Sequence, residues 1–291
     1  MTDQRPLVSI VLPVYNEEAA LSSDLEAIEQ TMRASKYQYE VLVIDDGSTD
    51  RSAAIAAAKG ARVIHHAMNR GYGSAIRTGI READGQIIVT TDADGSYPHS
   101  EIPSLLDRLD RHDLIVGARR GERGSARFLR TPAKRFIRWL ACMLTHAEIP
   151  DLNSGMRAFR KEIAQRYLNL LPPGFSCSAT LTMIFLCEGY QVGYVPIDYH
   201  PRVGRSKFRP IRDTANFVSL VWRMIFYFNP LRVLGPLSLV LIGLSAAKAI
   251  HDLVAYRLHI ATSTVLVFSL ALQALVIGLV ADLIIKRTRS G

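Results

Sequence analysis

The sequence predicts an α/β domain with a mostly parallel sheet and helices on both faces, followed by an apolar two-helix hairpin. Short β-branched runs alternate with helical segments over residues 1–120, which is typical of a parallel sheet. Acidic or polar clusters follow several of these runs, where the carboxyl ends of parallel strands would meet. Residues 231–285, by contrast, are dominated by apolar side chains.

The individual elements follow from the same patterns. Strands are predicted at residues 7–12, 39–44, 62–65, 86–91 and 113–119. Helices are expected after the first strand up to about Ala34, at 51–59, and after a glycine-rich turn at 69–75. Glu17 and Glu18 are expected in the first turn of the first helix, where the helix dipole favours anions.

Two carboxylates at the end of the strand that begins at Gln86 are the centre of the functional prediction. Asp92 and Asp94 are separated by one small residue, so both side chains would leave an extended chain on the same side. Two like charges this close repel each other unless a cation lies between them. Hard oxygen ligands favour Mg²⁺ or Mn²⁺, which keep positions open for substrate phosphates. A solvated acidic turn is the plain alternative for an isolated Asp-x-Asp.

Two other nucleotide-binding patterns do not fit. Gly71-x-Gly73 lacks the third glycine of a dinucleotide fingerprint and follows the wrong strand, and no Gly-x-x-x-x-Gly-Lys-Ser/Thr loop occurs. A nucleotide diphosphate would therefore be bound chiefly through a metal held by the Asp pair. The three cysteines have neither metal-ligand nor disulfide spacing, which indicates a reducing compartment.

Taken together, four motifs resemble family 2 inverting glycosyltransferases with a GT-A fold, a Rossmann-like sheet with helices on both faces. The motifs are Pro13-x-Tyr15-Asn16-Glu17, Asp45-Asp46-Gly47-Ser48, Asn69-x-Gly71-x-Gly73 and Asp92-Ala93-Asp94. The resemblance implies that Asp92 and Asp94 hold the metal. It also implies that a sugar nucleotide contacts Pro13, Tyr15, Glu17, Ile44, Asp46 and Ala93. Many relatives continue with leucine and a metal-assisting glutamine; here Gly95-Ser96 follows, which makes Ser96 a further candidate ligand.

Two basic runs point to a phosphate-bearing partner. Residues 117–138 contain eight basic side chains against Glu122 alone, and residues 202–212 contain five with no acid. Both runs flank the predicted phosphate site and precede an apolar segment, which favours lipid phosphate over nucleic acid or a plain solvated face. The candidate phosphate-binding residues in these runs are Arg127, Arg130, Lys134, Arg202 and Lys207.

Two later stretches narrow the resemblance to polyprenyl-phosphate glycosyltransferases, which include dolichyl-phosphate mannose synthase-like enzymes. They are Asp151 to Arg160, with its Ser-Gly-x-Arg motif, and Arg202-x-Gly204-x-Ser206-Lys207. The resemblance implies a catalytic Arg119, with Arg119, Arg202 and Lys207 on the diphosphate or lipid phosphate, and adds Ser154 to the acceptor side. The plain alternative is a tight turn at Ser154-Gly155, with Arg157 paired to a surface acid.

The apolar end predicts a multi-pass membrane anchor. Residues 231–250 and 260–285 are long enough to span a bilayer, and basic residues flank their outer ends, which places both termini in the cytosol. The aromatic-rich stretch before them reads as an interfacial helix. Gln273 within the second span indicates a possible homo-oligomer. The predicted division is a cytosolic GT-A domain at 1–210, an interfacial helix at 211–229 and a hairpin with a basic tail at 230–291.

These features predict a metal-dependent inverting transfer of one hexose from a UDP- or GDP-sugar to a polyprenyl (undecaprenyl or dolichyl) phosphate at the cell (inner) membrane. The sequence does not fix the sugar or the nucleotide, because backbone contacts to the base can serve either a pyrimidine or a purine. Three alternatives stay open: another lipid or glycan acceptor, a processive synthase, and a non-catalytic sugar-nucleotide sensor. A processive synthase would need a Gln-x-x-Arg-Trp motif, and the nearest match, Arg135 to Trp139, lacks the glutamine.

Overall fold

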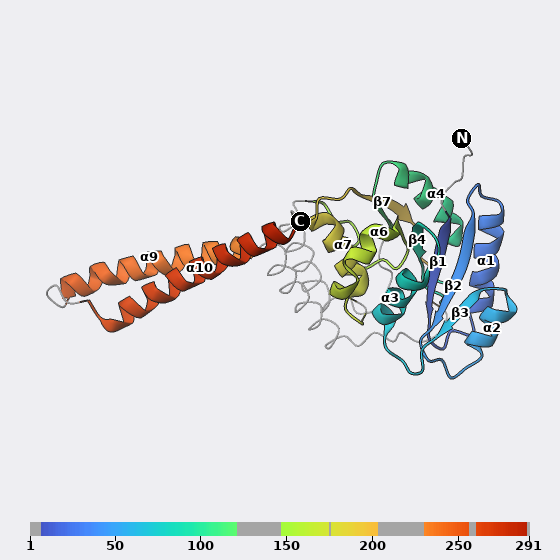
Figure 1. Ribbon diagram of the computed structural model, residues 1–291, viewed down its shortest axis with the longest axis horizontal. Helices are drawn as coiled ribbons and strands as arrows, with labels where there is room; N and C mark the ends of the chain where they lie inside the picture. Colours follow the sequence, from blue (N-terminus) through green and yellow to red (C-terminus); the bar gives the residue numbers. More distant parts are fainter. Residues whose placement is uncertain (1–6, 121–146, 175, 203–229, 256–259, 290–291) are drawn as a thin grey trace. The chain divides into compact units, whose positions relative to one another are not determined.

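The computed structural model describes residues 7–120, 147–174, 176–202, 230–255 and 260–289 (Figure 1). The chain divides into two compact units, residues 1–218 and 219–291, and each is described by itself. Several sequence predictions lie outside the described residues. They are the interfacial helix at 211–229 and the phosphate-binding candidates Arg127, Arg130, Lys134 and Lys207.

The first unit is built on a seven-stranded sheet in the order β3-β2-β1-β4-β6-β5-β7. All neighbouring strands are parallel except β6, which runs antiparallel to both β4 and β5. Strands covered on both faces read as continuous apolar runs, and the buried residues of β1 and β4 follow this rule. The strands are β1 (Val8–Val14), β2 (Tyr39–Asp45), β3 (Arg62–His65), β4 (Ile87–Thr90), β5 (Leu114–Arg119), β6 (Arg157–Arg160) and β7 (Val192–Ile197).

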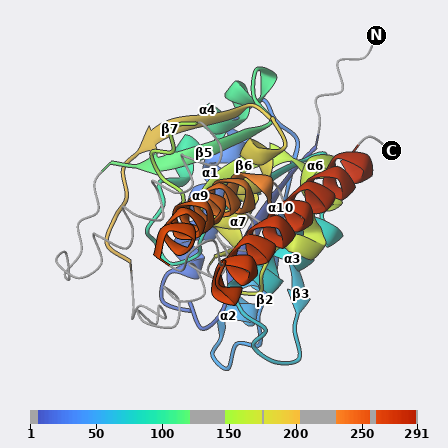
Figure 2. The same ribbon diagram turned by 90° about the vertical axis from the view of Figure 1, so that its left-hand side faces the viewer.

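Helices cover both faces of the sheet, as Figures 1 and 2 show from two sides. On one face the core joins apolar side chains of the strands to those of α1 (Leu21–Arg33), α2 (Ser52–Ala58) and α4 (Ile102–Asp107). On the other face α3 (Tyr72–Glu82) contacts β1 and β2 and also packs against α6 (Lys161–Arg166) and α7 (Cys177–Cys187). This arrangement confirms the predicted α/β class with a mostly parallel sheet.

The first helix begins later than the sequence indicated. Glu17 and Glu18 precede α1, so their predicted place in its first turn is wrong, and Asp24 is the acidic residue there. Two features delay the helix: Asn16 has a φ of 53°, and the next two backbone N–H groups are bound by side chains over thirty positions along the chain. The amide of Glu17 donates to Ser52 Oγ at 2.9 Å, and that of Glu18 donates to an Asp50 carboxylate oxygen at 3.1 Å.

The glycine-rich turn before α3 owes its composition to close backbone packing. Gly71 has a φ of 95°, and a Cβ there would lie 2.6 Å from the carbonyl oxygen of Pro173. A Cβ on Gly73 would overlap the carbonyl oxygen of Pro172 and lie 2.8 Å from Cys177 Cβ. The amide of Gly73 instead donates to Pro173 O at 2.8 Å. These glycines therefore allow the turn at 172–174 to lie directly against the start of α3.

We expect Gly73→Ala to lower the free energy of unfolding by about 1–3 kcal/mol, because the added methyl group meets backbone atoms that cannot rotate away. Gly174→Ala is the matched control in the facing turn, since a Cβ there has no neighbour within 4 Å. Thermal unfolding of the detergent-solubilised protein should show a fall of several degrees in Tm for the first variant and almost none for the second. Equal Tm values would contradict the close packing.

The second unit is a pair of helices, α9 (Leu231–Ala255) and α10 (Thr262–Arg289), which pack against each other. Each contains a window apolar enough to cross a bilayer, with mean hydropathies of 1.9 and 2.4. Only 11% and 17% of the residues in these windows are buried, unlike those of a core helix in a soluble protein. At 1.5 Å per residue, about 20 residues span the ~30 Å hydrocarbon layer, so both helices are long enough. The predicted apolar hairpin is therefore present.

A buried polar contact links α9 to the start of α10 near the segment that connects them. The carboxylate of Asp252 is buried between α9 and α10 and pairs with Lys248 at 3.2 Å. It also accepts hydrogen bonds from the Ala261 amide, at 3.1 Å, and from the Thr264 hydroxyl at the start of α10. A charged group in such a position stays favourable only when fully paired, as it is here.

Candidate active site

Two of the predicted nucleotide loops are joined to each other at the carboxyl edge of the sheet. They follow β1 and β2, which are parallel neighbours. The Asn16 amide donates to Ser48 Oγ at 3.0 Å, and the Thr49 amide donates back to Asn16 Oδ1 at 2.8 Å. Arg51 N–H donates to the Glu18 carboxylate at 3.2 Å. The two loops thus form one hydrogen-bonded rim, as the rule for parallel strands predicts.

Asp46 connects this rim to the glycine-rich turn. Its two carboxylate oxygens accept hydrogen bonds from the amides of Arg70, at 2.9 Å, and Gly71, at 2.8 Å. His66 Nδ1 lies 2.6 Å from the same carboxylate, and His66 Nε2 lies 2.9 Å from Thr78 Oγ1. A nucleotide would contact Asp46 only by sharing or displacing these bonds, so its predicted role stays a prediction.

The remaining nucleotide candidates differ in accessibility. Ile44 and Ala93 are buried, with 0% and 2% of their surface exposed, so only their backbone atoms could meet a ligand. Pro13, Tyr15 and Glu17 are partly exposed at the same rim. The structure therefore brings the predicted set together at one edge of the sheet.

Asp92 and Asp94 lie immediately beyond β4 in different surroundings. Asp94 is buried, and one of its oxygens accepts hydrogen bonds from the amide of Ser96, at 3.1 Å, and from its hydroxyl. The other oxygen forms an ion pair with Arg202. Asp92 Oδ1 is buried and has no hydrogen-bond partner among the described residues. A Cβ at Gly155 would lie 2.7 Å from that oxygen, so the glycine keeps the space beside it open.

The charge of this pair is only partly balanced by the protein. Burial and the neighbouring Asp94 charge raise the pKa of Asp92 to about 6, against the opposing effects of a Tyr72 hydrogen bond, Arg202 and Arg119. Burial removes water that would stabilise the carboxylate, and a like charge nearby disfavours ionisation further. A cation beside the two carboxylates would relieve both effects.

The residues present fit a divalent cation of the Mg²⁺ or Mn²⁺ type. Asp92 offers an unpartnered oxygen, and Asp94 offers a second carboxylate two residues away. The hydroxyl of Ser96 donates a hydrogen bond to Asp94, so it would orient that carboxylate toward the cation. Within the described ranges no group of three or more His, Cys, Asp or Glu side chains could hold a metal. Substrate phosphates or water would supply further ligands to such a cation, as they commonly do for Mg²⁺.

Arg119 is held in place at the end of β5. Its Nε lies 2.7 Å from Asp151 Oδ2 and its Nη2 lies 3.0 Å from Oδ1, a two-point contact that fixes the guanidinium plane. The guanidinium also lies over the ring of Tyr199, 5.3 Å from its centroid. Burial alone would raise the pKa of Asp151, but the bonds and charge of Arg119 outweigh it and hold that pKa below its ordinary value.

Arg157 corrects one alternative left open by the sequence. It is only 1% exposed, so a surface ion pair is wrong. Its guanidinium donates to the carbonyl oxygens of Ser154, at 2.6 Å, and Leu152, at 2.9 Å, and to that of Ser178. It also donates to Thr182 Oγ1 at 2.6 Å. Arg157 thereby fastens the loop at 151–155 to α7, with Ser154 fully buried inside it.

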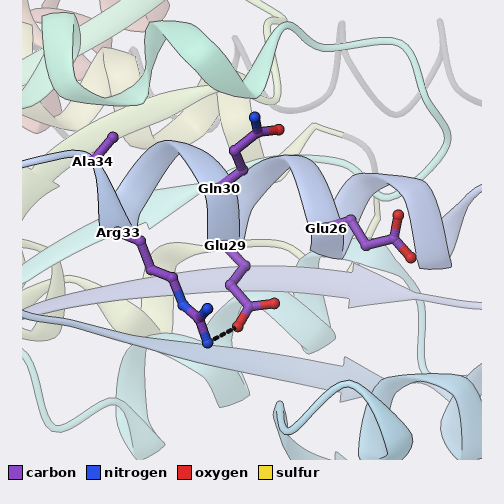
Figure 3. Close-up of a pocket in the computed structure, with 5 residues that line it drawn as sticks. All are labelled: Glu26, Glu29, Gln30, Arg33 and Ala34. Atoms are coloured by element: carbon purple, nitrogen blue, oxygen red, sulfur yellow. Dashed lines mark ion pairs between the residues drawn. The ribbon is translucent and has the colours of Figure 1, made fainter.

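A surface pocket lies along α1, outside this site (Figure 3). It is lined by the end of that helix, where Arg33 and Glu29 form an ion pair of 2.5 Å across one turn. Ion pairs of this exposed kind contribute little to stability or binding. We assign no function to the pocket, whose lining residues are Glu26, Glu29, Gln30, Arg33 and Ala34.

A GT-A-like sheet with an Asp-x-Asp pair at its carboxyl edge and an apolar C-terminal hairpin defines a membrane-associated glycosyltransferase. Comparison with family models agrees. Residues 9–168 match glycosyl transferase family 2, and residues 229–286 match the GtrB C-terminal hairpin. The chain belongs to glycosyl transferase family 2.

Curated relatives carry polyprenyl-phosphate names. A dolichyl-phosphate hexose transferase of Haloferax volcanii is 35% identical over 211 residues, covering 72% of this chain and 89% of the relative. An undecaprenyl-phosphate 4-deoxy-4-formamido-L-arabinose transferase of Pseudomonas fluorescens is 32% identical over 255 residues, covering 84% of this chain and 72% of the relative. The resemblance to the polyprenyl-phosphate branch is thus confirmed.

Solved structures support the fold. Glucosyl-3-phosphoglycerate synthase from Mycobacterium tuberculosis, in complex with Mn²⁺, UDP-glucose and phosphoglyceric acid, gives a TM-score of 0.59 at 21% identity, covering 75% of this chain and 79% of that one. Mannosyl-3-phosphoglycerate synthase from Rubrobacter xylanophilus gives 0.59 at 20% identity, covering 76% and 72%. At these identities the likeness shows the GT-A fold alone.

Proposed function

We propose that this glycosyltransferase moves one hexose from a UDP- or GDP-sugar to a polyprenyl phosphate in a metal-dependent, inverting reaction. The observation that carries the proposal is the Asp92–Asp94 pair, with its unpartnered oxygen beside Gly155. The names of the curated relatives support a polyprenyl phosphate acceptor. Solved neighbours that contain Mn²⁺ or Mg²⁺ with UDP support a divalent metal and a UDP-sugar.

The proposed step is an in-line displacement. An oxygen of the lipid phosphate forms a bond to the anomeric carbon, while the bond from that carbon to the diphosphate oxygen breaks and the nucleoside diphosphate leaves. A phosphate monoester is largely ionised at neutral pH, so the acceptor needs no protein base, unlike a sugar hydroxyl. A divalent cation on the Asp pair would balance the charge of the diphosphate.

The residues have distinct proposed tasks. Arg119, which is held by Asp151, would stabilise negative charge on the departing diphosphate. Arg202, on the other side of Asp94, and Lys207 would orient the acceptor phosphate, with help from the candidates Arg127, Arg130, Lys134 and Ser154. Pro13, Tyr15, Glu17, Ile44, Asp46 and Ala93 would bind the nucleotide sugar, and Ser96 would act on the metal through Asp94.

The proposed topology anchors the protein in the cell (inner) membrane, with the catalytic domain and both termini in the cytosol. Basic residues flank the outer ends of the hairpin. Between Lys248 and Lys286, by contrast, the sequence contains a single Lys or Arg residue, Arg257 in the connecting segment. The domain limits 1–210, 211–229 and 230–291, and a homo-oligomer formed through Gln273, belong to this proposal. The acceptor phosphate would then lie at the membrane surface with its tail in lipid.

Nucleotide release tests the proposal directly. The detergent-solubilised protein is mixed with UDP- and GDP-hexoses, with or without a polyprenyl phosphate, and with Mg²⁺, Mn²⁺ or EDTA. We expect release only when lipid phosphate and metal are both present, and the productive donor identifies sugar and nucleotide. Release that needs no lipid phosphate would indicate another acceptor. Sugar-nucleotide binding without any release would support the sensor alternative and overturn the proposal.

A further inference from the structure

A buried carboxylate on α1 contacts the turn that carries the Asp pair. Asp24 is 5% exposed, although it belongs to the first turn of a helix whose neighbouring acids are at the surface. One of its oxygens accepts a hydrogen bond from the amide of Gly95 at 2.9 Å. Gly95 directly follows Asp94 and has a φ of 73°, a left-handed conformation that glycine adopts at little cost.

The second oxygen of Asp24 faces a buried histidine. His99, in the short 3₁₀ turn His99–Glu101, is 4% exposed, and its Nε2 lies 3.2 Å from Asp24 Oδ1. The other ring nitrogen, Nδ1, lies 3.5 Å from Thr91 Oγ1. Thr91 directly precedes Asp92 and is itself fully buried. The Asp24–His99 pair therefore contacts the residue before the Asp-x-Asp segment and the residue after it.

The contacts of Asp24 and His99 restrain a turn whose own sequence, Gly95-Ser96, begins with a flexible residue. Gly95 gives the turn little intrinsic stiffness, because glycine has no side chain to pack. Ser96 already bonds Asp94 through its amide and its hydroxyl. The Gly95 amide has its hydrogen bond to Asp24 instead. His99 Nε2 lies within ion-pair distance of the other Asp24 oxygen and has no hydrogen-bond partner of its own among the described residues. Neither Asp24 nor His99 has a role in the proposed sugar transfer.

We propose that Asp24 and His99 are positioning residues that hold the Asp92–Asp94 turn in the geometry that binds the divalent cation. The proposal rests on the metal site of the proposed function and assigns it supporting residues outside the nucleotide-binding motifs. Residues that do not bind the metal but orient its ligands through hydrogen bonds typically contribute 10- to 100-fold to metal affinity. A purely structural role, joining α1 to the 3₁₀ turn, is the competing explanation, and it predicts a change in stability alone.

Mn²⁺ binding separates the two explanations. Binding is measured on the full-length protein in detergent from the free-Mn²⁺ electron paramagnetic resonance signal, with UDP or GDP present, and Tm is measured without metal. We expect Asp24→Leu and His99→Leu to weaken Mn²⁺ binding by about 10- to 100-fold. Asp24→Asn should retain affinity within roughly threefold, because its amide can still accept from Gly95 and donate to a neutral imidazole.

The control is Glu29→Gln, which removes an exposed carboxylate from the same helix and should leave Mn²⁺ affinity unchanged. In turnover assays the Asp24 and His99 variants should need more Mn²⁺ for half-maximal rate, while kcat at saturating Mn²⁺ stays close to that of the wild type. If Asp24→Leu does not fold, His99→Leu and Asp24→Asn still decide the question.

Two results would overturn the proposal, and they are distinguishable. Wild-type Mn²⁺ affinity in folded His99→Leu and Asp24→Leu variants, with only Tm lowered, would show that the pair is purely structural. Absence of Mn²⁺ binding in the wild-type protein, with any turnover unaffected by EDTA, would reject the metal site of the proposed function as well.

Discussion

Replacing Asp92 or Asp94 by alanine should reduce turnover by about a thousandfold or more. A metal site supplies several kcal/mol of charge stabilisation in a transition state, and each ~1.4 kcal/mol is a factor of ten in rate. For Asp92→Ala the stability should change much less, because Asp92 Oδ1 has no hydrogen-bond partner to lose among the described residues. A small gain in its Tm without metal is expected, since the repulsion between the two neighbouring carboxylates disappears.

The measurement is nucleotide release at saturating donor and lipid phosphate over a series of Mn²⁺ concentrations. Asp107→Ala is a suitable control, because it removes a half-exposed surface carboxylate that pairs with Lys36. Either Asp variant keeping most of the wild-type, metal-stimulated rate would show that the cation is bound elsewhere. A loss of activity that excess Mn²⁺ restores fully would indicate that the altered residue tunes affinity only.

Much of the first half of the fold was predictable because its signals are local. Apolar runs such as Ile87–Thr90 indicate buried strands, and the polar residues that follow each run must gather at one edge of a parallel sheet. The rim formed by the loops after β1, β2 and β4 follows from this rule. The family resemblance depended on the same motifs, which is why the fold and the class of enzyme were predicted together.

Features that depend on distant partners were not predictable. The start of α1 was misplaced because the amides of Glu17 and Glu18 are bound by Ser52 and Asp50, over thirty positions away along the chain. Nothing in the local sequence distinguishes Asp24 from an ordinary helix acid, and only the fold brings it to Gly95. Nor was β6 predicted: its short Arg-Ala-Phe-Arg pattern has charged ends, and nothing local indicates an antiparallel strand between β4 and β5.

Arg157 is the clearest of these cases and yields the second large expected effect. We expect Arg157→Met to lower the free energy of unfolding of the first unit by about 2–4 kcal/mol, because each buried carbonyl left without a donor costs roughly 1–3 kcal/mol. An opposing gain exists, since an uncharged side chain avoids the cost of burying a guanidinium. That gain is the smaller term here. The partners are mostly backbone carbonyls, which no substitution at residue 157 can remove.

Thermal unfolding of the detergent-solubilised variant tests this balance, with an expected fall in Tm of roughly 5–10 °C. Arg160→Met, on the same strand but with a half-exposed side chain, is the control and should shift Tm far less. Arg157→Lys should fall between the two, because a single ammonium cannot reach all of the acceptors that the planar guanidinium serves. An unchanged Tm for Arg157→Met would mean that the desolvation cost of the guanidinium cancels its hydrogen bonds.

The same variant should also lose activity at temperatures where it is still folded. Arg157 fastens the loop that places Asp151 against Arg119 and Gly155 against Asp92. A displacement of that loop by about 1 Å would disturb both, and misplacements of this size cost on the order of 100-fold in rate. We therefore expect kcat well below that of the wild type at 10 °C, with Arg160→Met unaffected. A folded Arg157→Met enzyme with normal kcat would show that the loop keeps its position without the guanidinium.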